Sequence, residues 1–260
     1  MTQFSIIIPT YNNLALLQSA LCSVTSQTYN HYEIIITDDS TNNKIKLYIE
    51  SLHNDKIRYF HHTKDDNPIS NWNHGIAKAT KDFIIILHHD ETLGTTTYLS
   101  TINDEIKKGS DIIISHVKVY DHQQLRQPIF PNCIKRTFIS HPALLFLCNA
   151  IGPSACLTVK RELVTPFCEQ LHWLVDVNWY YEVMHKHECR LLSEDVFVNS
   201  YNSHQDKITH NIDIKQTEKS DYNVLTKKYR FHPFIRTMLF FNKIATVYNL
   251  KQIIKHIIRK

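Results

Sequence analysis

Residues 5–13, Ser5-Ile-Ile-Ile-Pro-Thr-Tyr-Asn-Asn13, place a short apolar run directly before a group of polar residues. The same arrangement recurs in Glu33-Ile-Ile-Ile-Thr-Asp-Asp-Ser40 and in Phe83-Ile-Ile-Ile-Leu-His-His-Asp-Glu91. Continuous apolar runs of this length are typical of strands that are buried on both faces. Segments with helical spacing separate the runs, so the sequence predicts an α/β protein with a mainly parallel sheet.

The pattern is clearest in the first 117 residues. It predicts strands at residues 5–8, 33–37, 57–60, 83–87 and 111–117, and helices at residues 14–27, 44–52, 71–80 and 97–108. After Lys118 the pattern weakens. There it predicts a loop at 126–141, an apolar helix or buried segment at 142–150, a helix at 177–186, a polar loop at 200–216 and a helix from Thr237 onward.

Composition excludes several classes of protein. The 260 residues are 43% hydrophobic and 21% charged, which is ordinary for a soluble globular protein. The four glycines are too far apart for a Rossmann fingerprint or a P-loop. The six cysteines form no C-x-x-C pair, so we expect reduced core cysteines and no zinc site. No basic and apolar leader begins the chain, and the stretch at 143–148 is too short to span a bilayer, which favours a cytoplasmic protein.

The C-terminal tail is strongly basic. From Tyr222 to Lys260 there are nine Lys or Arg and no Asp or Glu, whereas the whole chain has a formal charge of only +4. This tail is expected to meet a membrane surface, a nucleic acid or an acidic partner. An ordinary packed helix with a solvated face is the alternative. A helix from Thr237 would place Ile244, Val247, Leu250, Ile254, Ile257 and Ile258 on one side, and Lys251, Lys255, Arg259 and Lys260 on the other.

The polar groups that end three of the strands form the candidate site. Ligands of open α/β sheets bind outside the carboxyl ends of the strands, so residues 10–13, 38–40 and 88–91 should open onto one edge. The first two groups also fit plain turns or helix caps. Turn propensity explains the third group, His88-His89-Asp90-Glu91, less well than it explains the first two. Its carboxylates and imidazoles suit Mn²⁺, Mg²⁺ or Zn²⁺, which could neutralise a diphosphate in place of a glycine loop.

Five motifs, in order and at matching spacing, resemble the family 2 glycosyltransferases of the GT-A fold. They are residues 5–12, 27–29, 33–40, 73–79 and 87–91, with thinner support from Gly152-Pro-Ser154, Asp176 and the region of His204. The resemblance implies a mainly parallel, Rossmann-like sheet flanked by helices, with a C-terminal helical extension. Residues 1–117 would be the nucleotide-sugar-binding half, 118–221 the acceptor-binding half of the same domain, and 222–260 a basic amphipathic helical tail.

The resemblance also implies the residues that hold the donor, which in this family is very often a UDP-sugar. Tyr11 matches the position that stacks near the nucleobase, and Asp39 matches the carboxylate that hydrogen-bonds the uracil. Asp38 supports that loop. The nucleotide-binding residues implied are Pro9, Thr10, Tyr11, Asn12, Asp38, Asp39, Asn73, His88 and His89.

A metal site is implied at residues 87–91, which align with the family's D-x-D motif. Asp90 would bind Mn²⁺ or Mg²⁺ on the diphosphate, and His204, or else His210, would complete the metal site. His88 stands where the first Asp usually does, which leaves the ribose contact and the choice of metal open. Glu91 or His89 is the candidate to compensate.

The family's general base matches Asp176, in Trp173-Leu-Val-Asp-Val-Asn-Trp179. A base of this kind deprotonates the acceptor hydroxyl as it attacks the anomeric carbon. Glu182 and Glu169 are weaker candidates, and a helix N-cap is the alternative role for Asp176. The acceptor contacts implied are Trp173, Trp179 and Glu91, with Tyr180 as a further stacking ring.

The sequence therefore predicts an inverting, metal-dependent hexosyltransferase. The donor would be a UDP-hexose or UDP-N-acetylhexosamine, and the acceptor a lipid-diphosphate-linked saccharide of O-antigen, capsule or lipooligosaccharide synthesis. The enzyme would be peripheral on the inner face of a bacterial inner membrane, with no nucleic acid partner. One alternative is a nucleotidyltransferase, although the glycine-rich basic loop of that class is missing. The other is a non-catalytic nucleic-acid-binding protein that uses the basic tail, against which the strand-end carboxylates argue.

Overall fold

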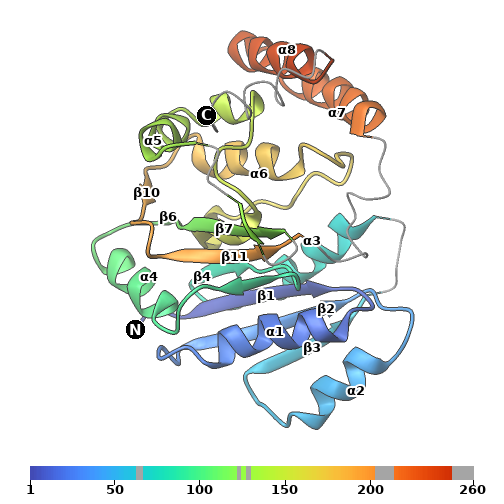
Figure 1. The fold of residues 1–260 in the computed structure, drawn as a ribbon, viewed down its shortest axis with the longest axis vertical. Helices are drawn as coiled ribbons and strands as arrows, with labels where there is room; N and C mark the ends of the chain where they lie inside the picture. The colour runs from blue at the N-terminus through green and yellow to red at the C-terminus, as the bar shows by residue number, and fades with distance from the viewer. Residues whose placement is uncertain (63–66, 122–123, 127–129, 203–213, 248–260) are drawn as a thin grey trace. The chain divides into compact units, whose positions relative to one another are not determined.

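The computed structural model describes residues 1–62, 67–121, 124–126, 130–202 and 214–247. These residues form two compact units (Figure 1). The first unit comprises residues 1–126, 151–166 and 187–204, and the second comprises residues 127–150, 167–186 and 205–260. In the part of the chain described, no helix is long and apolar enough to cross a membrane.

The larger sheet of the first unit is mainly parallel, as predicted. β1, β2, β3 and β4 run parallel, as do β6 and β10, while β9 runs antiparallel between β4 and β6. The order of the seven strands described is β10 (Cys189–Leu191), β6 (Ile112–Ile114), β9 (Leu157–Lys160), β4 (Phe83–Ile86), β1 (Phe4–Thr10), β2 (Tyr32–Asp38) and β3 (Ile57–His61).

A smaller sheet was not predicted from the sequence. Its order within the described residues is β5 (Glu91–Leu93), β11 (Phe197–Tyr201), β7 (His116–Asp121) and β8 (Gln124–Leu125). The single strand expected at 111–117 is wrong, because Ser115 breaks it into β6 and β7, which belong to different sheets. Ser115 is held by its N–H, which donates to Cys156 O at 2.9 Å, and by the Tyr98 hydroxyl, which donates to its Oγ at 2.9 Å.

The helices of the first unit agree with the predicted ones to within a few residues. α1 begins after Asn13, whose side chain accepts the Leu16 N–H at 3.1 Å as an N-cap. α3 begins three residues earlier than predicted, because Asn67 caps it and Pro68 occupies its first turn. The bounds are α1 (Leu14–Thr25), α2 (Lys44–Ser51), α3 (Pro68–Lys78) and α4 (Tyr98–Lys107), with short 3₁₀ turns η2 (Ser154–Cys156) and η3 (Arg161–Leu163).

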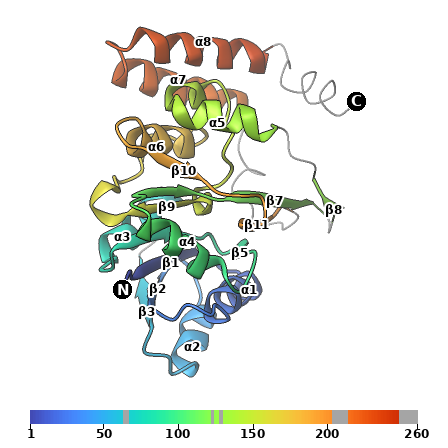
Figure 2. The ribbon, with the colours of Figure 1, turned by 90° about the vertical axis from the view of Figure 1, so that its left-hand side faces the viewer.

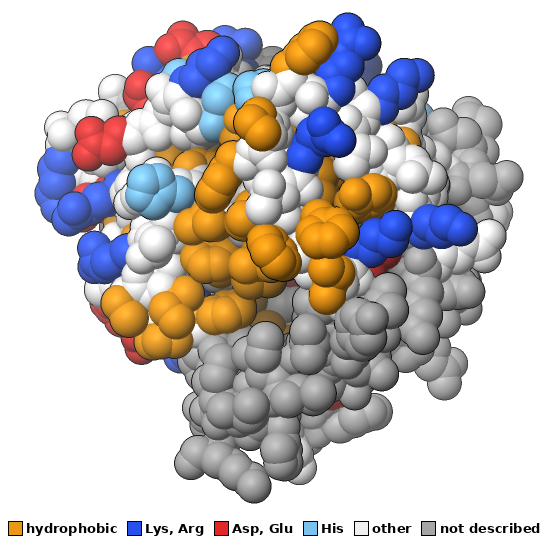
Figure 3. All heavy atoms as spheres, turned by 90° about the horizontal axis from the view of Figure 1, so that it is seen from above, with side chains coloured by type: hydrophobic (Ala, Val, Ile, Leu, Met, Phe, Trp, Pro, Cys, Tyr) orange, Lys and Arg blue, Asp and Glu red, His pale blue; other side chains and the backbone are white. Residues whose placement is uncertain are grey.

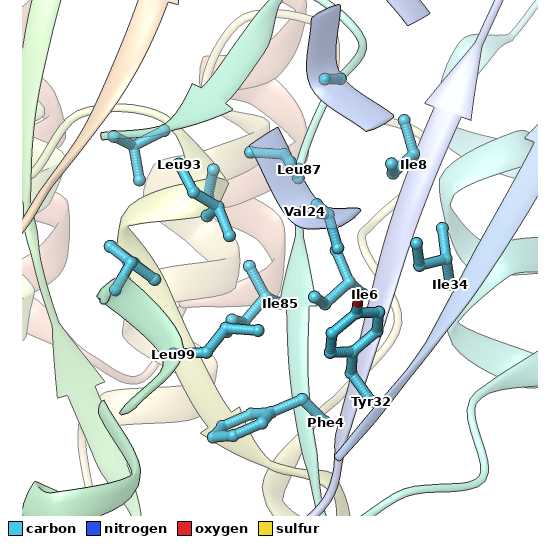
Figure 4. Packing of buried hydrophobic residues seen from close by; sticks show 14 of the residues in the cluster. Phe4, Ile6, Ile8, Val24, Tyr32, Ile34, Ile85, Leu87, Leu93 and Leu99 are labelled. Atoms are coloured by element: carbon cyan, nitrogen blue, oxygen red, sulfur yellow. The ribbon is translucent and has the colours of Figure 1, made fainter. Parts of the chain in front are cut away.

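The core of the first unit lies on both faces of β1. Ile6 and Ile8 point into a cluster with α1, β4, β5 and α4 (Figure 4). Ile7 points to the opposite face, where α3 lies so close that a Cβ on Gly75 would stand 2.4 Å from Ile7 Cγ2. This double burial explains why the strands read as continuous apolar runs.

The second unit is helical in the residues described, and α7 and α8 lie side by side (Figures 1 and 2). Its elements are α5 (Asn132–Ser140), η1 (Pro142–Phe146), α6 (Val175–Met184), α7 (Ile214–Lys228) and α8 (Pro233–Val247). The loop predicted at 126–141 is wrong over α5, which follows Pro131 and buries Phe138 and Ile139. α8 begins four residues before Thr237, and residues 248–260 of the predicted tail helix lie outside the described residues.

The prediction of core cysteines is wrong for most of the six. Only Cys156 is buried, while Cys22 and Cys133 are exposed. Cys22 lies one position away from the buried stripe of α1, which consists of Leu17, Ala20, Leu21 and Val24. All six are free thiols, as predicted.

Candidate functional site

The three polar groups meet at one edge of the larger sheet, as the sequence predicted. Thr10 pairs with Asp38, so β1 and β2 end together, and β4 ends opposite Ile7 in the same direction, three residues earlier. The loops beyond them are joined by hydrogen bonds. The Asp39 N–H donates to Thr10 O at 3.2 Å, and the Asn12 N–H donates to Ser40 Oγ at 2.7 Å.

Asn12 is the centre of the loop after β1. Its backbone has φ 52°, a left-handed conformation that Asn adopts more readily than most residues. Its side-chain Oδ1 accepts the N–H of Thr41 at 3.0 Å and the amide of Asn42 at 3.0 Å. The side chain predicted to contact a nucleotide therefore holds the two loops together.

Asp38 and Asp39 are both buried but have different partners. Asp38 accepts the Ser40 N–H at 2.8 Å and the Tyr59 hydroxyl at 2.8 Å, which is the loop support that was predicted for it. Burial and the nearby Asp38 carboxylate raise the pKa of Tyr59 above its ordinary value. Asp39 Oδ1 lies 2.8 Å from His62 Nδ1. His62 and Tyr59 were missed in the sequence analysis, because nothing in the spacing of residues 57–62 marks them.

His89 connects the end of β4 to the end of β1. Its Nδ1 lies 3.1 Å from Thr10 Oγ1 and accepts the Tyr11 N–H at 3.3 Å. Because a backbone N–H can only donate, Nδ1 carries the lone pair and the proton of the neutral ring is on Nε2. His89 is therefore oriented as a hydrogen-bond donor through Nε2, which suits an anionic oxygen.

His88, at the position of the first Asp of the D-x-D motif, is held on three sides. Its N–H donates to Glu91 Oε2 at 2.8 Å, its Nε2 lies 3.1 Å from Ser154 Oγ, and its ring meets the Trp72 ring edge-on with centroids 4.6 Å apart. Burial lowers the pKa of His88 to about 4, so the ring is neutral at pH 7. If the resemblance to the D-x-D motif holds, a neutral imidazole stands where that motif has its first carboxylate.

Glu91 was predicted as an acceptor contact, but the structure gives it a different role. It is buried, and it closes the turn of residues 88–91, since its N–H also donates to His88 O at 2.9 Å. Its backbone then pairs with Ser200 as the first residue of β5. A carboxylate used in this way orients residues 88–90 and is not presented to a saccharide.

Asp90 remains the candidate metal ligand. Its side chain is half-buried, between the two histidines and Glu91. Among the described residues no group of three or more His, Cys, Asp or Glu could hold a metal ion by itself. A single carboxylate still fits Mg²⁺ or Mn²⁺, because such ions are commonly bound by one or two carboxylates together with substrate phosphates. His204 and His210 lie outside the described residues.

The remaining predicted donor contacts lie at the same edge or close to it. Pro9 and Thr10 are the last residues of β1 and are buried. Asn73 is half-buried on α3, next to the Trp72 that packs on His88. Asn71 of the same helix donates to Thr37 O at 3.1 Å, which fixes the helix against β2.

Asp176 belongs to the second unit. It lies in the first turn of α6, after Leu174 as N-cap, so the alternative role of Asp176 as an N-cap is wrong. Burial raises the pKa of its carboxyl to about 7, against the lowering that a helix N-terminus favours. A carboxylate with this pKa can accept a proton near neutral pH.

Asp221 of α7 supports the residues before α6. Its buried carboxylate accepts three consecutive N–H groups, from His172 at 3.1 Å, Trp173 at 2.7 Å and Leu174 at 2.8 Å. A second contact joins α6 to the residue that follows α7: the Tyr229 hydroxyl donates to Asn178 Oδ1 at 2.8 Å. No motif marks Asp221, because its partners are nearly 50 residues away in the sequence.

The two tryptophans predicted to contact the acceptor differ. Trp173 is half-buried. Trp179 is only 1% exposed and stacks on Phe167 with ring centroids 4.8 Å apart, so it is a core residue of the second unit and not a sugar platform. Tyr180 is likewise buried. Glu182, a weaker candidate for the base, is paired with Lys228.

The model of the family described as Glycosyl transferase family 2 matches residues 5–145, which contain the whole strand-end site. The chain belongs to glycosyl transferase family 2. Its fold is that of the GT-A glycosyltransferases, as the sequence predicted. The family match ends before Asp176, which therefore rests on its own geometry.

Relatives and solved structures agree with this family. The chain is 31% identical over 112 residues to the GalNAc(5)-diNAcBac-PP-undecaprenol beta-1,3-glucosyltransferase of Campylobacter jejuni, a match that covers 42% of this chain and 36% of the relative. The match thus spans about a third of that protein's length.

S. aureus TarS in complex with UDP-GlcNAc superposes with a TM-score of 0.69 at 15% identity, covering 85% of this chain and 65% of TarS. The mannosyltransferase PcManGT from Pyrobaculum calidifontis, in complex with GDP-Man and Mn²⁺, superposes with a TM-score of 0.62 at 14% identity, covering 93% and 69% of the two chains. At these identities the likeness concerns the fold.

Proposed function

We propose that this chain is an inverting glycosyltransferase that moves a hexose or N-acetylhexosamine from a UDP-sugar to a saccharide acceptor. The observation that carries the proposal is the junction of three strand ends, where His89 joins Thr10 and Tyr11 and Asp39 bonds His62. A site at the carboxyl edge of a parallel sheet is where such folds bind nucleotides. The UDP-GlcNAc in TarS supports a uridine donor.

In this proposal the donor nucleoside lies against Tyr11 and Asp39. The His62 contact keeps the Asp39 carboxylate fixed in the position where it would accept a hydrogen bond from the base. The Nε2–H of His89 donates to an oxygen of the diphosphate. His88 orients the turn and contributes no charge, because its ring is neutral.

The proposal assigns a divalent ion, Mn²⁺ or Mg²⁺, to Asp90. When bound, that ion supplies Lewis-acid stabilisation of the departing diphosphate. With His88 at the first position of the motif, Asp90 is the carboxylate of residues 87–90 that this chain offers to the ion. Oxygens of the diphosphate and water complete such a coordination shell.

Asp176 is the proposed general base. It accepts the proton of the acceptor hydroxyl while that oxygen bonds to the anomeric carbon and the bond from this carbon to the diphosphate oxygen breaks. A single displacement of this kind turns an α-linked donor into a β-linked product. Trp173, three residues before Asp176, is the proposed acceptor platform.

The acceptor we propose is a lipid-diphosphate-linked saccharide of O-antigen, capsule or lipooligosaccharide synthesis. Support comes from the Campylobacter relative, whose name gives its acceptor as a saccharide linked to undecaprenol through a diphosphate. A bacterial enzyme with such an acceptor would work at the inner face of the inner membrane.

Thermal unfolding with UDP, GDP, ADP or CDP, each with Mn²⁺, Mg²⁺ or EDTA, tests the donor site. A ligand at 100 times its Kd stabilises a fold by about 2.7 kcal/mol, which shifts the Tm clearly. We expect a shift with UDP that needs a divalent ion and is lost in Asp90→Ala. Asp104→Ala, which changes an exposed carboxylate on α4, is the matched control and should keep the shift. If no nucleotide shifts the Tm with any ion, the donor site is wrong.

A further inference from the structure

The helix α8 has apolar residues on two opposite faces. Ile235 and Leu239 are buried on its inner face. Asn242 on the same face donates from its side chain to Phe146 O and Leu147 O, both at 2.9 Å. These contacts fix the rotation of α8 about its axis, so its opposite face is directed away from the rest of the second unit.

The outer face of α8 should be polar if the helix were an ordinary surface helix. It carries instead Phe234, Phe240 and Phe241, which are 52%, 51% and 49% exposed, and Phe231 just before the helix is 80% exposed. Figure 3 shows hydrophobic side chains gathered on the face where α7 and α8 lie. A cluster of exposed phenylalanines of this kind marks an interaction surface.

Basic residues border these rings. Arg236 and Lys243 are exposed on α8 beside Phe240, and the Arg230 guanidinium lies 4.5 Å from the centre of the Phe231 ring. Figure 3 shows Lys and Arg side chains at the margin of the hydrophobic area. From Tyr222 to the end of the sequence there is no Asp or Glu to balance them.

We propose that the outer face of α8 docks on an anionic phospholipid bilayer. The helix would lie in the plane of the interface, with the rings of Phe231, Phe234, Phe240 and Phe241 among the acyl chains and the bordering cations on the headgroups. The proposal goes beyond the glycosyl transfer proposed above, and it rests on α8 and the residues just before it.

Charge and shape favour a bilayer over other partners. Two copies of this face would bring two sets of cations together without any acidic residue in the segment 222–260 to pair with them. A nucleic acid would be attracted by the cations but would leave several of the rings in water. An anionic bilayer accepts both, since it is apolar in its interior and negative at its surface.

Co-sedimentation of the full chain with vesicles tests the proposal. We expect binding to vesicles of phosphatidylcholine with phosphatidylglycerol, and weaker binding to phosphatidylcholine alone or in high salt. Phe240→Ser/Phe241→Ser should lower the partition coefficient by at least about tenfold, because two rings no longer insert. Leu47→Ser, at an exposed position of α2, is the matched control and should bind as the wild type does.

A charge-reversal pair sharpens the test. Arg236→Glu/Lys243→Glu should remove the preference for anionic vesicles, whereas Lys44→Glu/Lys46→Glu, an equal change of net charge on α2, should keep it. Each variant should keep the wild-type Tm, since the changed side chains are exposed.

The proposal would be overturned if the wild type did not bind anionic vesicles, or if the wild type and the phenylalanine variant bound them equally. It would also be overturned if the wild type bound no vesicles but self-associated or bound single-stranded RNA, and the phenylalanine variant lost that binding. The UDP-induced Tm shift of the same variants distinguishes a failure here from a failure of the donor site.

Discussion

The strand-end edge of the first unit and the α6–α8 region of the second unit use buried polar groups in different ways. At the strand ends, each polar group is a run of consecutive residues that directly follows an apolar run, although the bonds between groups join distant positions, as Asn12 does with Thr41 and His89 with Thr10. In the helical unit, Asp221 and Asn242 reach backbone groups about 50 to 100 residues away. Local motifs therefore mark the first region, while only the folded chain shows the second.

The largest effect is expected at Asp176, which tests whether the helical unit carries chemistry at all. Asp176→Asn should lower kcat by about 10²–10⁴-fold, because the acceptor hydroxyl loses its base. The wild-type kcat/KM should rise with pH through about 7, where Asp176 ionises, and this step should vanish in the variant. Release of UDP from the UDP-sugar that gives the largest Tm shift measures both.

The same variant should also be more stable at alkaline pH. Burial raises the pKa of Asp176 from its ordinary value near 4 to about 7. Ionisation of this carboxyl therefore destabilises the folded state increasingly as the pH rises between these two values. At pH 8 the variant should therefore gain roughly 1–3 kcal/mol in the free energy of unfolding, and at pH 4 almost nothing. Glu188→Gln, an exposed position after α6, is the control. For the kinetic prediction, a kcat of Asp176→Asn within about tenfold of the wild-type value would contradict the assignment of the base.

Asp221→Ala should give the largest loss of stability. It leaves three N–H groups before α6, of which that of Leu174 is fully buried, without their acceptor, which costs about 3 kcal/mol. In a chain of this size the Tm should fall by roughly 6–12 °C. Asp104→Ala should leave the Tm within about 1 °C, because surface ion pairs contribute little. Equal Tm values for the two variants would show that Asp221 does not hold the residues before α6.

Gly75→Ala tests the packing of the first unit. The added Cβ would stand 2.4 Å from Ile7 Cγ2, so α3 or β1 must shift, at a cost of about 1–3 kcal/mol. Urea unfolding measures the loss. Gly109→Ala is a contrasting control that separates backbone strain from a steric clash. Nothing lies within 4 Å of its added Cβ, but its φ of 98° strains any side chain. The double variant Gly75→Ala/Ile7→Ala, which lacks Cγ2, should lose less stability than the sum of the two single variants if the methyl contact is the cause.

The smallest effect is expected at His62. His62→Gln removes an imidazole 2.8 Å from Asp39 Oδ1, so the carboxylate becomes less well fixed and the Kd for UDP should rise about fivefold to tenfold. Titration calorimetry with UDP and the preferred divalent ion measures this. His53→Gln, exposed at the end of α2, should leave the Kd unchanged. An unchanged Kd in His62→Gln would remove His62 from the donor site.

The parts of the fold and of the site that could be predicted from the sequence differ between the strand-end region and the helical unit. β1, β2 and β4 were predicted because burial on both faces makes them continuous apolar runs. β9 and α7 were not, since β9 is a four-residue strand and α7 is rich in polar residues, held by Asp221, Leu225 and the following Tyr229. As residues of the same type, Trp173 and Trp179 have the same intrinsic tendency to be buried. Only the fold shows that Trp179, within α6, is buried, while Trp173, before the helix, is less so.

The break at Ser115 bears on how the first unit unfolds. One run of chain, residues 112–121, provides a strand to each sheet, with a single residue between them. Neither sheet can lose this run without pulling on the other, so the two should melt in one cooperative transition. Amide hydrogens of β6 and β7 should then exchange with the same free energy of opening, although they belong to separate sheets.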